Sequence, residues 1–92
     1  MIEPLSIQID SQLFFLGFNR DFERETLYYR HYTNGEVRVT IRYEFPDTYH
    51  VSFNNVGWGR PHNWKPVTTV RDMIRQYRKF QLDCRVESVH ER

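Results

Sequence analysis

This sequence has very little cysteine and no long hydrophobic run. Its one cysteine, Cys84, excludes a disulfide bond within the chain, which is compatible with a reducing compartment. The apolar run at residues 13–16 is far too short to cross a bilayer, and the N-terminus lacks the basic and apolar regions of a signal peptide. We therefore expect a cytoplasmic protein with no membrane partner.

Glycine is also scarce, with four residues, and no glycine-rich phosphate-binding loop is present. Gly57 and Gly59 flank a tryptophan, but the glycine and lysine that open the helix of such a loop do not follow. The four histidines lack the spacing of a metal site, and we interpret Cys84 as a small buried hydrophobic residue. The sequence thus predicts no cofactor, no metal site and no catalytic residues, and a protein that is not an enzyme.

The chain is short, and its 92 residues predict a single domain over residues 1–92. Seven Phe, six Tyr and two Trp residues partly compensate for the small core, because each ring buries a large area. A domain of this size leaves little room for a deep, enclosed active site.

Charge is nearly balanced over the whole chain, with a net charge of +1. Its distribution is uneven, since residues 1–25 hold five acidic residues and two arginines, whereas residues 60–80 hold six basic residues and one aspartate. The balance argues against a non-specific nucleic-acid coat and against an acidic mimic of DNA. The asymmetry predicts one basic patch.

The clearest structural signal is residues 37–45, where apolar and polar residues alternate at every position. This period predicts a strand with one buried and one wet face, and the turn signals on both sides make it the centre of a meander. Further strands are expected at residues 7–9 and 26–32. Residues 12–18 could form a strand or one or two helical turns, and their glycine and aromatic residues favour a strand.

The turn at residues 34–35 admits two registers between the second strand and the central one. A two-residue loop would pair Thr33 with Glu36 and place Tyr32 on the buried face. A three-residue loop would pair Tyr32 with Glu36 and place Leu27 on that face instead. We favour the second register, because it buries a leucine rather than an arginine.

At the next turn, a loop of residues 46–48 would pair Phe45 with Tyr49 and Ile41 with Phe53. All four side chains would then share the core face. The opposite face would be polar and wet, and it would carry Glu36, Arg38, Thr40, Arg42, Glu44, His50 and Ser52.

A helix is predicted over residues 69–81. Thr69 and Asp72 have the spacing of a capping box. A buried stripe recurs at helical spacing and consists of Val70, Met73, Ile74, Tyr77 and Phe80. The predicted fold is therefore α+β, an antiparallel meander of three to four strands with this amphipathic helix packed on one face. Residues 85–92 are expected to form an edge strand or a frayed tail.

Two features of the C-terminal half predict a partner-binding surface. The helix carries basic residues on one ridge, and the long loop before it holds tryptophan and basic residues, which dominate protein interfaces and also stack on bases. The predicted contact residues are Trp58, Arg60, Lys65, Arg71, Arg75, Arg78 and Lys79.

Each feature also has a purely structural interpretation. The arginines could form the solvated back of an amphipathic helix, and the tryptophans could cap a thin core. We expect Trp58 to be the recognition anchor and Trp64 to be structural. Lys65 precedes a proline and is therefore extended, which would direct Trp64 toward the seam between helix and sheet.

These features predict a small non-enzymatic binding protein that occludes an acidic or phosphate-bearing surface of a protein or a protein–nucleic acid complex. Phage-encoded inhibitors of host defence, including anti-CRISPR proteins, contain small α+β chains of similar size and build, and such an inhibitor would act in the host cytoplasm. That analogy is based only on size and fold class, and no particular residue or motif supports it.

Two alternatives use some of the same residues. The first is a nucleic-acid-binding protein that contacts its ligand through the basic helix and the tryptophan-containing loop. The second, more remote, is a metal-free nuclease with His50 or His62 as general base and Arg60 or Lys65 as phosphate clamp.

Overall fold

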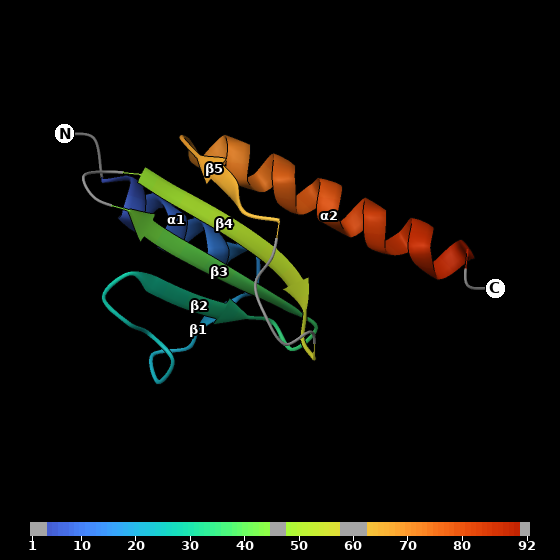
Figure 1. Ribbon diagram of the computed structural model, residues 1–92, viewed down its shortest axis with the longest axis horizontal. Coiled ribbons are helices and arrows are strands. Elements are labelled where there is room, and N and C mark those ends of the chain that lie inside the picture. The colour runs from blue at the N-terminus through green and yellow to red at the C-terminus, as the bar shows by residue number, and fades with distance from the viewer. Residues whose placement is uncertain (1–3, 45–47, 58–62, 91–92) are drawn as a thin grey trace.

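The computed structural model describes residues 4–44, 48–57 and 63–90, the last six of them by backbone alone. In these residues, helices α1 (Leu5–Phe15) and α2 (Val70–His90) lie on one face of a five-stranded antiparallel sheet. The strands are β1 (Asn19–Arg20), β2 (Tyr29–Thr33), β3 (Val37–Glu44), β4 (Thr48–Asn55) and β5 (Lys65–Val67). They neighbour one another in chain order, so the sheet is a meander, and α2 projects well beyond it (Figure 1).

The predicted α+β class, the antiparallel meander and the covering helix are confirmed. The sheet has more strands than the three to four predicted, because β1 and β5 are edge pieces of two and three residues. Segments this short carry no readable alternation in sequence.

The N-terminal segment is a helix, so the strand predicted at residues 7–9 and the strand favoured at residues 12–18 are wrong, and the helical alternative is correct for residues 12–15. Leu5, Ile9 and Leu13 follow one another at a spacing of four and face the core. Ile7, which alternates with Ile9 in sequence, is exposed. The misleading pattern arises because apolar residues lie on both sides of this helix.

Gly17, which favoured a strand in the sequence, instead ends α1. Its backbone is left-handed, with φ of 92°, a conformation that glycine adopts without strain. The N–H of Gly17 donates to the carbonyl of Phe14 at 3.0 Å, and that of Phe18 donates to Leu13 at 2.9 Å. These two bonds form a Schellman motif, and they return Phe18 to the core.

Neither predicted pairing of β2 with β3 is correct, since Tyr32 lies opposite Val39 and Thr33 opposite Arg38. The favoured register also assigned the wrong face: Tyr32 is 2% exposed, whereas Leu27 lies before the strand and is 83% exposed. The alternative register had the correct faces. The loop lies one residue later than the predicted three-residue loop, at residues 34–36, and within it the side chain of Asn34 accepts two following backbone N–H groups, at 2.9 and 2.8 Å.

The pairing of β3 with β4 is shifted by two residues from the prediction, so that Ile41 lies opposite Val51 and Tyr43 opposite Tyr49. A shift of two preserves the faces, because side chains alternate with a period of two. Phe45 and two of the predicted loop residues, Pro46 and Asp47, lie outside the described residues.

The sheet face opposite the helices is not the wet surface predicted. Thr40 and Ser52 at its centre are both 0% exposed. The Trp64 ring lies on this face, with its centroid 4.6 Å from the guanidinium carbon of Arg42 and 6.3 Å from the Tyr29 ring. Trp64 is thus on the face opposite the predicted helix–sheet seam, because alternation from β5 places it there.

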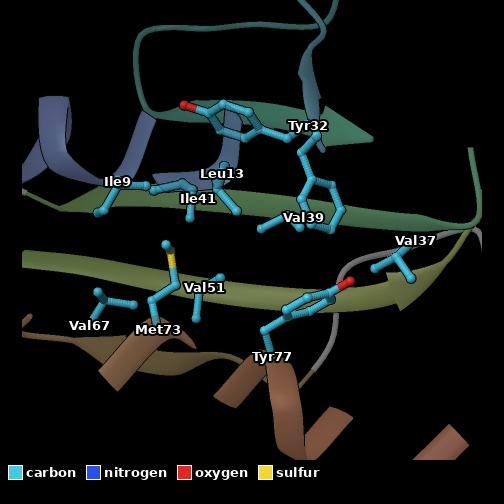
Figure 2. Packing of buried hydrophobic residues seen from close by; sticks show 11 residues of the cluster. Ile9, Leu13, Tyr32, Val37, Val39, Ile41, Val51, Val67, Met73 and Tyr77 are labelled. Atoms are coloured by element: carbon cyan, nitrogen blue, oxygen red, sulfur yellow. The ribbon is translucent and has the colours of Figure 1, made fainter. Parts of the chain in front are cut away.

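The core lies between the helices and the sheet, and Figure 2 shows Met73 and Tyr77 pointing from α2 toward the strands. Tyr77 forms an edge contact with Phe18 at 5.4 Å and a tilted contact with Phe53 at 5.5 Å. Phe53 also stacks on Phe80 at 6.0 Å. These ring contacts anchor α2 across β4 and confirm the predicted buried stripe.

Helix α2 begins as predicted and ends later. The hydroxyl of Thr69 accepts the backbone N–H of Asp72 at 3.1 Å, which is one half of the capping box. The Asp72 carboxylate accepts the Thr68 hydroxyl at 2.7 Å. Residues 82–90 contain no glycine or proline, so nothing stops the helix, and the strand or tail predicted for residues 85–90 is wrong.

Candidate functional site

The three predicted arginines lie on the outward side of α2. Arg71, Arg75 and Arg78 are exposed, whereas Met73 and Tyr77 on the opposite side of the helix are buried. Their spacing of four and three places the arginines along one ridge, which we call the arginine ridge. The structure therefore brings together three of the residues that the sequence selected, although their contact with a partner remains a prediction.

Little negative charge offsets this ridge. The Arg75 guanidinium lies 3.8 Å from the Asp72 carboxylate, and the Arg75 side chain is 75% exposed. An ion pair this open to solvent holds its partners weakly. Within the described part of the chain, Arg71 and Arg78 form no ion pair. The ridge thus presents cationic groups that an anionic surface can contact at little cost.

A groove of about 720 Å³ runs beside the ridge, between α2 and the edge formed by β4 and β5. Lys65 from β5 and Lys79 from α2 both line it. Phe53 and Phe80, whose rings stack with an interplanar angle of 26°, also line it. The groove therefore combines an aromatic surface with two ammonium groups, next to the arginine ridge.

The seven predicted contact residues thus fall into three places. The ridge holds Arg71, Arg75 and Arg78, and the groove holds Lys65 and Lys79. Trp58 and Arg60 lie outside the described residues. Lys79 lies one helical turn after Arg75 on α2, so it is the groove residue nearest to the ridge.

Sequence reasoning missed the polar wall of the groove. Gln76, Lys79 and Asp83 share one side of α2, a pattern that their spacing of three and four could have revealed. Cys84 also lines the groove and is half-buried, rather than buried as we interpreted it. Its sulfur lies 4.0 Å from Nδ2 of Asn55 on β4.

Of the residues proposed for a nuclease, the two that the structure describes do not come together. His50 lies on the sheet face opposite the helices, with Nδ1 3.9 Å from Glu44. Lys65 lies opposite Val51 on the helix-bearing face. His50 and Lys65 are therefore on opposite faces of the sheet, while His62 and Arg60 lie outside the described residues.

Two further side chains, His31 and Tyr32, have shifted pKa values that burial and neighbouring groups explain. Burial lowers the pKa of His31, and the nearby charges of Arg38 and Arg24 lower it further. Burial and a hydrogen bond to Asp10 raise the pKa of Tyr32 to about 12. In the described residues, no three His, Cys, Asp or Glu side chains gather to hold a metal ion.

No protein-family model matches this chain, and neither the curated proteins nor the solved structures yield a match. Neither helix, over the residues that the structure describes, is long and apolar enough to cross a membrane. The case for a function therefore depends on the chain's own surface.

Proposed function

We propose that this protein is a non-enzymatic binding protein that occludes an acidic or phosphate-bearing surface of a macromolecular partner. The observation that supports this proposal is the arginine ridge of α2, where Arg71, Arg75 and Arg78 are exposed and, among the described residues, only Asp72 forms an ion pair with one of them. Guanidinium groups bind carboxylates and phosphates through paired hydrogen bonds. A ridge of three can contact several anionic groups of one partner.

The ridge is well suited to recognition because it does not stabilise the fold. Exposed arginines on the back of a helix contribute little to the free energy of unfolding, so their charges can be altered without loss of structure. Complementary charge accelerates association and excludes partners of like charge. Binding that depends on the ridge should therefore weaken as salt screens it.

An affinity capture experiment with an Arg71/Arg75/Arg78→Glu triple variant tests this proposal. The wild-type protein should retain its partner from a cytoplasmic extract, and the variant should lose it while keeping its unfolding midpoint. The matched control is Arg24→Glu, which reverses an exposed arginine outside α2. Capture of the same partner in equal amount by the triple variant would exclude the ridge from the interface.

The alternative is a nucleic-acid-binding protein, which the same cationic groups favour because nucleic acids are polyanions. A ligand held by four to six cationic contacts should lose on the order of a hundred- to a thousandfold in affinity between 50 and 200 mM salt. An electrophoretic shift assay with DNA and RNA measures this dependence. Absence of any shift at low salt would exclude naked nucleic acid as the ligand.

A phage-type inhibitor of host defence, of which anti-CRISPR proteins are one kind, is the biological role that the size and α+β build support by analogy. Expression in a host with an active CRISPR system should then raise the plating efficiency of a targeted phage. The triple variant should not raise it. Unchanged plating with the wild-type protein would count against an anti-CRISPR role in that host.

A further inference from the structure

In the described residues, several backbone groups at the edges of the sheet already form hydrogen bonds within the chain. On the β2 side, the N–H of Asp21 donates to the carbonyl of His31 at 2.7 Å, and that of Thr26 donates to Tyr29 at 2.9 Å. These loop residues occupy backbone groups that would otherwise attract another strand. The part of β2 that extends past the short strand β1 is therefore already hydrogen-bonded.

The β5 edge is closed by different means. Pro66 lies opposite His50 and has no N–H to offer an incoming strand. Its carbonyl accepts a hydrogen bond from Nε2 of Gln76 on α2, at 3.2 Å. A proline and a helix side chain thus cover the short outer strand.

The second half of β4 is different, because β5 pairs only with residues 49–51 in its first half. Pairing between the two strands stops at Val51 and Lys65, and Asn63 has a left-handed φ of 54°, which breaks the extended conformation. Among the described residues, β3 is then the only strand paired with the end of β4. This part of the edge borders the groove, which Phe53 and Asn55 line.

The direction of the backbone groups follows from one hydrogen bond. The N–H of Val56 donates to the carbonyl of Glu36, the residue before β3, at 2.9 Å. In an antiparallel pair these bonds involve alternate residues, so Ser52 and Asn54 also direct their backbone groups toward β3. Phe53 and Asn55 direct theirs the other way, toward the groove.

The groove supplies side-chain chemistry for a segment placed there. The stacked rings of Phe53 and Phe80 offer an apolar contact, and Lys65 and Lys79 supply two ammonium groups, whereas Asp83 is the one carboxylate among the described lining residues. An added strand presents alternate side chains to the helix-bearing face. A segment whose groove-facing residues, at every second position, include both apolar and acidic side chains therefore matches the groove.

We propose that β4 takes up an extended segment of a partner protein as an added strand, in line with β5 and beneath the overhang of α2. The segment is acidic, and its backbone bonds to the N–H and carbonyl groups of Phe53 and to the N–H of Asn55, whose carbonyl already accepts Nδ2 of Asn54 at 3.5 Å. This inference rests on the proposed binding function and names a protein as the partner. The arginine ridge, on the outer side of α2, would contact the rest of that partner.

Hydrogen exchange of the free protein gives the first test. The amide of Phe53 should exchange at least about tenfold faster than those of Ser52 and Asn54, because only the latter two bond to β3. Equal protection of all three amides would show that the chain itself already covers this edge, and would overturn the proposal.

Binding of a fluorescent hexapeptide gives the second test; its first, third and fifth residues are valine, glutamate and valine, with threonine between them, so that both kinds of side chain reach the groove. Asn55→Pro removes the outward N–H without disturbing the bonds to β3, and should weaken binding tenfold or more. The control Asn55→Ala keeps the N–H and should bind as wild type does. Equal affinity for the two variants, or no binding to the wild type at millimolar peptide, would overturn the proposal.

Two peptide controls keep the test independent of the fold of the proline variant. A peptide N-methylated at alternate residues cannot pair as a strand, and one with lysine in place of glutamate cannot match the ammonium groups. Both should bind the wild-type protein at least tenfold more weakly. Equal binding of either would contradict strand addition or the acidic specificity, respectively.

The proposed function, which depends on the arginine ridge, and the strand addition, which depends on the groove, can be disproved separately. Loss of partner capture by the arginine variant alone, with Asn55→Pro unaffected, would keep the proposed function and overturn the strand addition. Sedimentation tests the other occupant, a second copy of this chain. A wild-type dimer that Asn55→Pro converts to monomer would assign the edge to self-association and overturn the inference.

Discussion

At the scale of single residues, Asp10 joins three elements. Its Oδ1 accepts the hydroxyl of Tyr32 on β2 at 2.8 Å and a guanidinium N–H of Arg20 on β1 at 3.3 Å. Arg20 in turn donates through Nε to Glu25 at 2.8 Å. This network fixes α1 against the first two strands.

Tyr32→Phe should lower the free energy of unfolding at pH 7 by about 2 kcal/mol, since it removes a buried hydrogen bond to a carboxylate. The pKa of Tyr32 is raised to about 12, above its ordinary value of 10. The stabilisation is therefore complete below pH 10 and is lost as pH rises toward 12. Urea unfolding of both proteins from pH 8 to 11.5 measures this, and parallel pH profiles would contradict it.

His31→Gln should flatten the acid side of the stability profile. Burial and the positive charge of Arg38 lower the pKa of His31, so the unfolded chain takes up this proton at a higher pH than the folded one. The stability that the neutral ring contributes is complete above the unfolded pKa of about 6.5 and decreases as pH falls through it. Unfolding free energies between pH 7.5 and 5 should depend less on pH in the variant, and an unchanged slope would oppose this assignment.

The two tryptophans should respond differently to truncation. Trp64→Ala removes the ring that lies over Arg42 and should cost about 2 kcal/mol of stability, because the ring is half-buried and in contact with a cation. Trp58→Ala should leave stability nearly unchanged and reduce partner binding by about 2 kcal/mol. Thermal melting and affinity capture of both variants separate these roles. Equal destabilisation would remove Trp58 as a recognition anchor.

At the scale of elements, the start of α2 is set by local chemistry. Thr69→Ala removes the oxygen that accepts the N–H of Asp72 and should cost about 1 kcal/mol. Thr68→Ala is the matched control, since it deletes an exposed hydroxyl that bonds only the Asp72 side chain, and it should cost less. Urea unfolding followed by far-ultraviolet circular dichroism compares the two. A larger loss in the Thr68 variant would show that Thr69 is not the cap.

At the scale of the whole molecule, both helices and four of the strands contribute to one buried cluster. α1 supplies Ile9 and Leu13, α2 supplies Met73 and Tyr77, and the sheet joins them (Figure 2). Urea unfolding should therefore be a single transition, with tryptophan fluorescence and circular dichroism giving the same midpoint. Separate midpoints would show that one helix detaches before the sheet unfolds.

The sequence by itself determined the elements whose signals are local. The alternation in residues 37–45 predicted β3, and the helical stripe around Met73 and Tyr77 predicted α2 with its cap at Thr69. The arginine ridge followed from the same helical spacing. These succeeded because a period or a cap depends on residues only a few positions apart.

Only the tertiary structure decided the remaining features. Helix α1 has apolar residues on both sides, so its sequence shows no helical period. Only the structure shows that Ile9 and Leu13 form its buried side. The groove exists because β5 covers β4 only as far as Lys65, whereas α2 continues past the sheet. Residues of β4, β5 and α2, which are far apart in sequence, then line it together. Which backbone groups of β4 face that groove depends on the register with β3, and register depends on distant contacts that a single sequence does not display.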